Sequence, residues 1–214
     1  MCASRRAIPF RLKIAFTVWV GVWAPIYYVS YGPQNYLWVC DVANFLILYA
    51  LWAEDRLIMS SQLVATLVVG MLWSFDLGTA LVTGVHPFGA TQYMFAGETA
   101  PAVRLLSLFH VFLPIVSAYA CAKIGYLSRG FWVQVAITAV LVPLSRLVST
   151  AEQNINWVYG LFGATDHPLP AALYLTGLFL GYALLLYLPA HGIVLAARRF
   201  ARASPPAGQA RNRL

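Results

Sequence analysis

Six long apolar stretches alternate with short polar segments along the chain. A bilayer core of about 30 Å needs roughly 20 apolar residues in a helix that rises about 1.5 Å per residue. Stretches of about this length cover residues 14–31, 36–53, 61–83, 104–122, 131–150 and 171–195. Turn signals or charges bound them, as in the segments YGPQN, AEDR and DHPLP. The pattern predicts an all-α fold, a polytopic transmembrane helical bundle with six spans.

The first and last segments are predicted to lie outside this bundle. The chain begins with a basic segment that resembles the start of a signal peptide, but no small-x-small cleavage site follows the first apolar run. The end of the chain is rich in Pro, Ala and Arg and has no apolar periodicity. We therefore expect a cytoplasmic N-terminal segment at 1–13, the membrane domain at 14–196 and a disordered basic tail at 197–214.

The composition agrees with a membrane protein, and the charges predict its orientation. Hydrophobic residues make up 61% of the chain and charged residues only 10%, against about a quarter in an average globular domain. All of the 14 lysines and arginines except Arg104 and Arg146 fall on one side of the predicted spans. Basic residues mark the cytoplasmic side, so both termini are expected in the cytoplasm and the long connections 84–103 and 151–170 outside an inner membrane.

The basic residues do not form a stripe interleaved with aromatic residues, so nucleic acid is not an expected partner. The expected partners are the lipid bilayer and a lipid-like or small amphipathic ligand. Gly177 and Gly181 offer a small-xxx-small contact for close helix packing, which leaves an oligomer or a larger membrane complex open.

Several ionisable residues interrupt the apolar spans. Each costs about 2.5–3.5 kcal/mol on insertion scales, so each calls for a partner or a function. Counted at about 1.5 Å per residue, four of them lie roughly 6–10 Å inside the outer ends of four different spans. They are Asp41, Asp76, His110 and Arg146, and Arg104 lies at a helix mouth on the same side. The sequence therefore predicts a polar pocket that opens to the outer side.

One interpretation of this pocket is a metal-assisted hydrolase. Asp41, Asp76 and His110 would supply three ligands to a divalent ion such as zinc and leave an open position for water. Arg146 would then hold a phosphate or carboxylate of the substrate. The chain has no HExxH or HxxxH spacing to support a zinc motif.

Three other interpretations use the same residues. In a metal-free enzyme, Asp76 and His110 would act as an acid/base pair, with Cys40 as a nucleophile at the same depth. A carrier or small-ligand receptor would use the Asp and Arg side chains to bind its substrate or a proton. In the simplest interpretation, Asp41, Asp76 and Arg146 form a structural ion-pair cluster that fixes the helix register.

The segment AEQNINWVYG, at residues 151–160, is unusually polar for this chain. Asn154 and Asn156 follow directly from the end of the span that carries Arg146, and each amide offers two donors and an acceptor. We expect these amides to fold toward the pocket, where they would orient a polar headgroup or stabilise a developing oxyanion. The competing expectation is an aromatic belt at the membrane interface, formed by the Trp and Tyr residues of the loop.

The segments YLWVCDVANF, SLFHVFLP and EQNINWVYG resemble a family of uncharacterised bacterial six-helix integral membrane proteins with an NINW loop. The resemblance covers most of the membrane region and brings no activity with it. The positions that it implies as worth testing are Asp41, His110, Asn154, Asn156 and Trp157.

The preferred interpretation is a membrane-embedded hydrolase or transferase that acts on a lipid-like or amphipathic substrate. Its catalytic groups or metal ligands are predicted to be Asp41, Asp76 and His110. Its substrate contacts are predicted to be Arg104, Arg146, Asn154, Asn156 and Trp157. A non-enzymatic carrier, a receptor or an accessory subunit of a membrane complex stays open.

Overall fold

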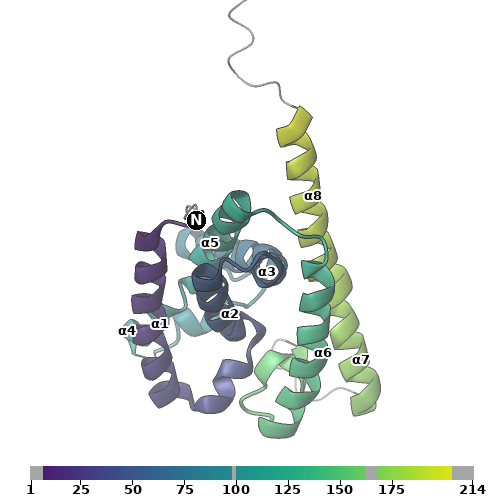
Figure 1. The fold of residues 1–214 in the computed structure, drawn as a ribbon. Helices are drawn as coiled ribbons and strands as arrows, with labels where there is room; N and C mark the ends of the chain where they lie inside the picture. Colours follow the sequence, from purple (N-terminus) through teal and green to yellow (C-terminus); the bar gives the residue numbers. More distant parts are fainter. Residues whose placement is uncertain (1–6, 98–99, 162–167, 204–214) are drawn as a thin grey trace, which may run out of the picture.

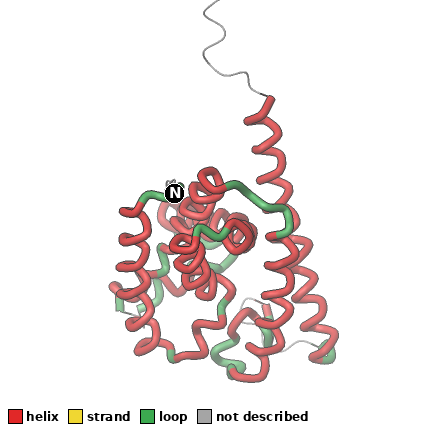
Figure 2. Tube along the Cα trace, viewed as in Figure 1, coloured by secondary structure: helices red, strands yellow, loops and turns green. Residues whose placement is uncertain are grey.

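The computed structural model describes residues 7–97, 100–161 and 168–203, and most of them are helical (Figures 1 and 2). The chain termini, including 204–214 of the expected tail, lie outside these residues. In chain order the α-helices are α1 (Phe10–Tyr31), α2 (Val39–Ala53), α3 (Arg56–Thr83), α4 (Pro101–Leu106), α5 (Phe109–Ile124), α6 (Gly130–Val148), α7 (Ala171–Gly181) and α8 (Leu188–Ala203). Shorter helical turns are η1 (Pro33–Leu37), η2 (Gln92–Met94) and η3 (Ile155–Trp157), and a π-helix, η5 (Tyr182–Tyr187), joins α7 to α8.

The all-α helical bundle is confirmed, and five of its helical segments are long and apolar enough to cross a membrane. The second predicted span is shorter than expected. Its helix, α2, has 15 residues and so a length of about 22 Å, which is less than the hydrocarbon thickness. Trp38 separates α2 from η1 because its backbone is extended, with φ −55° and ψ 133°. At the other end of the chain, α8 continues to Ala203, so 197–203 of the expected tail are helical.

Helix α3 lies at the centre of the bundle and packs against α2, α5 and α6. Figure 1 places α1 on one side of it and α6, α7 and α8 on the other. We call the end where α1 begins and α8 ends the terminal end, and the end where α3 and α6 end the loop end (Figure 1). The loop end carries η1, η2 and η3, and all residues of the predicted outer pocket lie in its half of the bundle.

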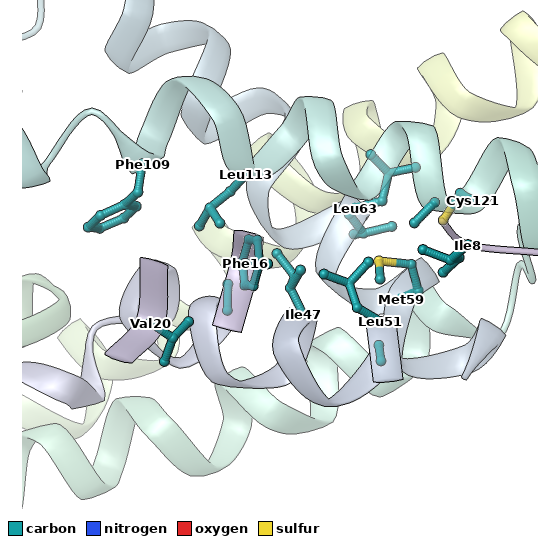
Figure 3. Close-up of a cluster of buried hydrophobic side chains, with 14 of the residues drawn as sticks. Ile8, Phe16, Val20, Ile47, Leu51, Met59, Leu63, Phe109, Leu113 and Cys121 are labelled. Carbon is teal, nitrogen blue, oxygen red and sulfur yellow. The ribbon is translucent and has the colours of Figure 1, made fainter. Parts of the chain in front are cut away.

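The core is apolar and joins the N-terminal helices to α3 and α5. Figure 3 shows Phe16, Ile47, Leu63 and Leu113 packed between these helices, and each is at most 3% exposed. Many large apolar side chains also cover the outside of the bundle, as a lipid-facing surface requires. No heavy atom lies within 4 Å of the Cβ positions built on Gly177 and Gly181, so this pair makes no close helix contact within the described chain.

Candidate functional site

Asp76 anchors the loop that follows α3. Its carboxylate is fully buried and accepts hydrogen bonds from the backbone N–H of Phe88 (2.7 Å), the backbone N–H of Thr91 (2.9 Å) and the Thr91 hydroxyl (2.6 Å). The Nδ1 atom of His86 lies 3.7 Å from the same carboxylate. Three donors therefore direct the carboxylate toward its own loop, which fixes the loop over the bundle.

Asn156 holds the NINW segment against the start of α2. Its Oδ1 accepts the backbone N–H of Val39 (3.0 Å), and its Nδ2 donates to the carbonyl of Leu37 (2.6 Å) and to Ser145 Oγ (2.9 Å). The backbone of Asn156 is left-handed, with φ 54°, a conformation that Asn adopts more readily than most residues. The amide folds inward against the end of η1 and the start of α2 rather than standing at the surface, and all three of its hydrogen-bonding positions are used within the protein.

Asn154 and Trp157 have similar roles in the same segment. Asn154 Nδ2 donates to the carbonyl of Gly160 (2.8 Å), and its Oδ1 accepts the backbone N–H of Tyr159 (2.9 Å). The Trp157 ring meets that of Trp38 edge to face at 5.7 Å, and its carbonyl accepts the hydroxyl of Tyr174 (2.6 Å). These contacts shape the loop itself.

His110 lies between two aromatic rings in the loop half of the bundle. Its ring stacks on Phe109 at 4.2 Å and on Trp73 at 4.9 Å. Its Nδ1 lies 2.9 Å from the carbonyl of Ser107, which can only accept, so Nδ1 carries the hydrogen and Nε2 is the proton acceptor of the neutral ring. Nε2 has no hydrogen-bond partner in the part of the chain that the structure describes.

The two arginines at the loop end differ in their surroundings. The guanidinium of Arg146 lies over the Tyr159 ring, 3.9 Å from its centroid. Arg104 donates from Nη1 to the carbonyl of Met94 (2.7 Å), whereas its Nε is buried without a partner among the described residues. Neither guanidinium has a carboxylate within 4.0 Å in that part of the chain. Both therefore keep donors that could bind an anionic group.

A thiol, a carboxylate and an amide form a chain of contacts at the start of α2. The thiol of Cys40 lies 4.0 Å from Asp41 Oδ1, at the long limit for a hydrogen bond from sulfur. Asn35 Nδ2 donates to the other carboxylate oxygen, Oδ2, at 2.8 Å. Asp41 is 2% exposed, so its orientation is fixed by these two neighbours and by packing. This is the order of nucleophile, base and orienting group that covalent catalysis uses.

Tyr93, on η2, covers this region from the loop side. Its hydroxyl interacts with Ser107 and Trp73 and lies within electrostatic range of Cys40. Burial of that hydroxyl raises the pKa of Tyr93 to about 12. Ser107 Oγ also lies 2.8 Å from the hydroxyl of Tyr27. Because Trp73 stacks on His110, Tyr93 connects the surroundings of Cys40 with those of His110.

The structure corrects the expected convergence of three metal ligands. Residues 7–97, 100–161 and 168–203 contain no group of three His, Cys, Asp or Glu side chains that could hold a metal ion. The physical reason lies in local hydrogen bonding: the carboxylate of Asp76 turns toward Thr91, and that of Asp41 turns toward Asn35. The three residues were expected at similar depths along their helices, but their side chains point in different directions.

The sequence did not predict two residues that surround Cys40 and Asp41, namely Asn35 and Tyr93. Asn35 precedes α2 in a turn, and Tyr93 lies in a loop, so neither has helical spacing to relate it to Cys40. A second buried polar group was also missed: Gln134 and Thr138 on α6 bond to the hydroxyl of Tyr187, and Gln134 also bonds to Gln62 on α3. The only sequence signal for that group was the presence of two glutamines inside apolar spans.

Two shallow grooves lie away from these residues. One, of about 240 Å³, is lined by Val142, Pro143 and Phe179 between α6 and α7. The other, of about 360 Å³, follows Phe75 and Gly78 on α3. Both are mostly apolar, as expected of surfaces that lipid chains cover.

Comparison with protein-family models, curated proteins and solved structures finds no match to this chain.

Proposed function

We propose that this chain is a membrane-embedded hydrolase or transferase that acts on an ester of a lipid-like substrate through the thiol of Cys40. The observation that carries the proposal is the alignment of Cys40, Asp41 and Asn35 at the start of α2. A thiol needs a base to become a good nucleophile, and the base needs a fixed orientation. Asp41 is the proposed base, and Asn35 holds it in place.

The start of α2 adds electrostatic support for such a reaction. Cys40 is the second residue of α2. The N-terminus of a helix carries a partial positive charge, which favours a thiolate and the oxyanion of a tetrahedral intermediate.

The proposed reaction has two steps. Cys40 transfers its proton to Asp41 and attacks the ester carbonyl; the C–O bond then breaks, and the leaving alcohol takes the proton from Asp41. The acyl group is now a thioester on Cys40. In the second step, water or a second alcohol attacks the thioester and gives its proton to Nε2 of His110, and the departing thiolate receives that proton. Water makes the chain a hydrolase, and an alcohol makes it a transferase.

The remaining predicted residues support this site indirectly. Arg104 is the proposed contact for an anionic headgroup, because its Nε lacks a partner among the described residues and its helix, α4, directly precedes Ser107. Asp76 is reassigned from catalysis to holding the loop that carries Tyr93. The orientation predicted from the basic residues places this site in the outer half of an inner membrane, with both termini in the cytoplasm.

The test is acylation of the purified full-length chain in detergent by a phospholipid with a labelled acyl chain. Intact-mass measurement should show one added acyl group that hydroxylamine removes. Cys40→Ser should abolish it, while the matched variant Cys121→Ser, which changes a buried thiol in the terminal half, should retain it. Asp41→Asn should slow acylation by about 100-fold or more, and His110→Gln should make the thioester persist. Acylation of Cys40→Ser, or none in any folded variant, would overturn the proposal.

A non-enzymatic receptor, carrier or accessory subunit is the second candidate. It is favoured by the internal use of Asp76 and Asn156, whose hydrogen-bonding atoms are engaged within the protein. Absence of acylation together with a large loss of thermal stability in Asp41→Asn would support this alternative.

A further inference from the structure

Two arginines from distant parts of the chain lie against the turn that joins α5 to α6, at the terminal end. Arg198 of α8 donates from Nη1 to the carbonyl of Tyr126 (3.0 Å), and its guanidinium lies 5.7 Å from the centre of the Tyr126 ring. Arg56, at the start of α3, lies against Gly125: a Cβ built there would be 2.9 Å from Nη2 and 3.3 Å from Cζ of Arg56. Two consecutive residues of one turn, Gly125 and Tyr126, are thus each contacted by a guanidinium group.

This pair of positive charges has no acidic partner in the described chain. No carboxylate lies within 4.0 Å of either guanidinium among residues 7–97, 100–161 and 168–203. Glu54 is engaged with Lys13 at 2.8 Å, and Asp55 Oδ1 accepts the first backbone N–H groups of α3. An anion at this turn that contacted both guanidinium groups would be stabilised by two opposite charges.

The turn that positions the two arginines is fixed by its own contacts. Gly125 has φ 94°, a conformation that favours glycine, and the absence of a side chain there makes room for Arg56. The hydroxyl of Tyr126 hydrogen-bonds to Nδ1 of His191 on α8 (2.5 Å). The backbone N–H of Leu127 donates to Ser60 Oγ on α3 (2.9 Å). The site is therefore held by α3, α5 and α8 before any ligand binds.

We infer that Arg56 and Arg198 together bind a phosphate group at the terminal end of the bundle. The planar fork of a guanidinium matches phosphate oxygens, and two forks can hold one phosphate from two directions. Arg198 uses Nη1 to hold the turn and keeps its remaining donors for the ligand. The α8 segment continues with Arg199 and Arg202, which raise the local anion concentration without being part of the site. The phosphate belongs to an anionic phospholipid headgroup or is a free phosphate ion.

The test measures binding by native mass spectrometry on the delipidated full-length chain in detergent. Three probes separate the sources: phosphatidylglycerol, diacylglycerol, which has no phosphate, and inorganic phosphate. We expect one preferred phosphatidylglycerol site, at least tenfold weaker in Arg56→Gln and in Arg198→Lys, which keeps the charge but loses the fork. Arg129→Gln and Arg202→Gln remove a charge from the same end and should change the affinity less than twofold.

The two possible origins of the phosphate, a lipid headgroup and a free ion, predict different results. Displacement of the lipid by millimolar inorganic phosphate, with binding of phosphate alone, assigns the site to the free ion; resistance to it assigns the site to the headgroup. Equal weakening in all four variants, or equal binding of diacylglycerol, would overturn the inference in favour of general surface charge. Unchanged thermal midpoints of the Arg56→Gln and Arg129→Gln variants show that folding is not the cause. The measurement is independent of any reaction at Cys40.

Discussion

Replacement of Asn156 by alanine tests whether the NINW segment is structural. The variant loses three hydrogen bonds, to Val39, Leu37 and Ser145, each worth about 1 kcal/mol net. It also places a residue other than Asn at φ 54°, which adds about 1–2 kcal/mol. We therefore expect the free energy of unfolding to fall by about 4 kcal/mol. A residue that only contacted substrate would not change it.

The assay is unfolding of the chain in detergent micelles, followed by tryptophan fluorescence as a denaturant is added. Gln153→Ala is the matched control, because Gln153 is an exposed amide in the same loop and, among the described residues, bonds only to Thr150. The control should change the free energy of unfolding by less than about 0.5 kcal/mol. A loss below about 1 kcal/mol in Asn156→Ala would refute the structural role and return this amide to the substrate site.

Three further predictions concern the rest of the bundle. Burial alone would raise the pKa of Glu54, but its hydrogen bonds from Lys13 and the backbone lower it overall. A lowered pKa in the folded state stabilises the protein above the unfolded value of 4.5, and this stabilisation is lost as the pH falls through the folded pKa. The thermal midpoint of wild type should therefore exceed that of Glu54→Gln at neutral pH, and the two should converge in acid, below pH 4.5. Gly130→Ala should destabilise by about 2 kcal/mol or more, because its Cβ would lie 2.6 Å from that of Ser60; Gly78→Ala, with nothing within 4 Å, should be neutral or stabilising in the same denaturant titration. Asp76→Asn places an amide N–H group among three donors, so limited proteolysis should cut the 84–97 loop faster than in wild type, and equal rates would contradict the anchoring role.

The apolar pattern predicted the helices well because membrane spans are defined by local properties. Each long stretch had to be a helix, since lipid offers no partner for the backbone N–H and C=O groups. The error at α2 has a tertiary cause: Asn156, more than 100 residues away, bonds to the N–H of Val39 and the carbonyl of Leu37 at the start of that helix. A window of hydropathy carries no information on such a contact.

The candidate site was predicted from the depth of its residues along the spans, and depth was insufficient. Asp41, Asp76 and His110 lie in the same half of the bundle, but depth along a helix does not determine which way a side chain turns. The carboxylate of Asp76 accepts hydrogen bonds from the loop that follows α3, whereas that of Asp41 contacts Asn35 and Cys40. Loop residues such as Asn35 and Tyr93 follow no helical period, so only the folded chain could bring them to the site.

The sequence by itself determined the class of the protein, because apolar length and the scarcity of charge depend on composition along a single segment. It also determined which few polar residues had to be accounted for, because burial in lipid makes each of them costly. Only the tertiary structure decided their partners. Hydrogen bonds such as those of Asn156 and Arg198 join residues more than 70 positions apart, and their geometry exists only once the helices have packed.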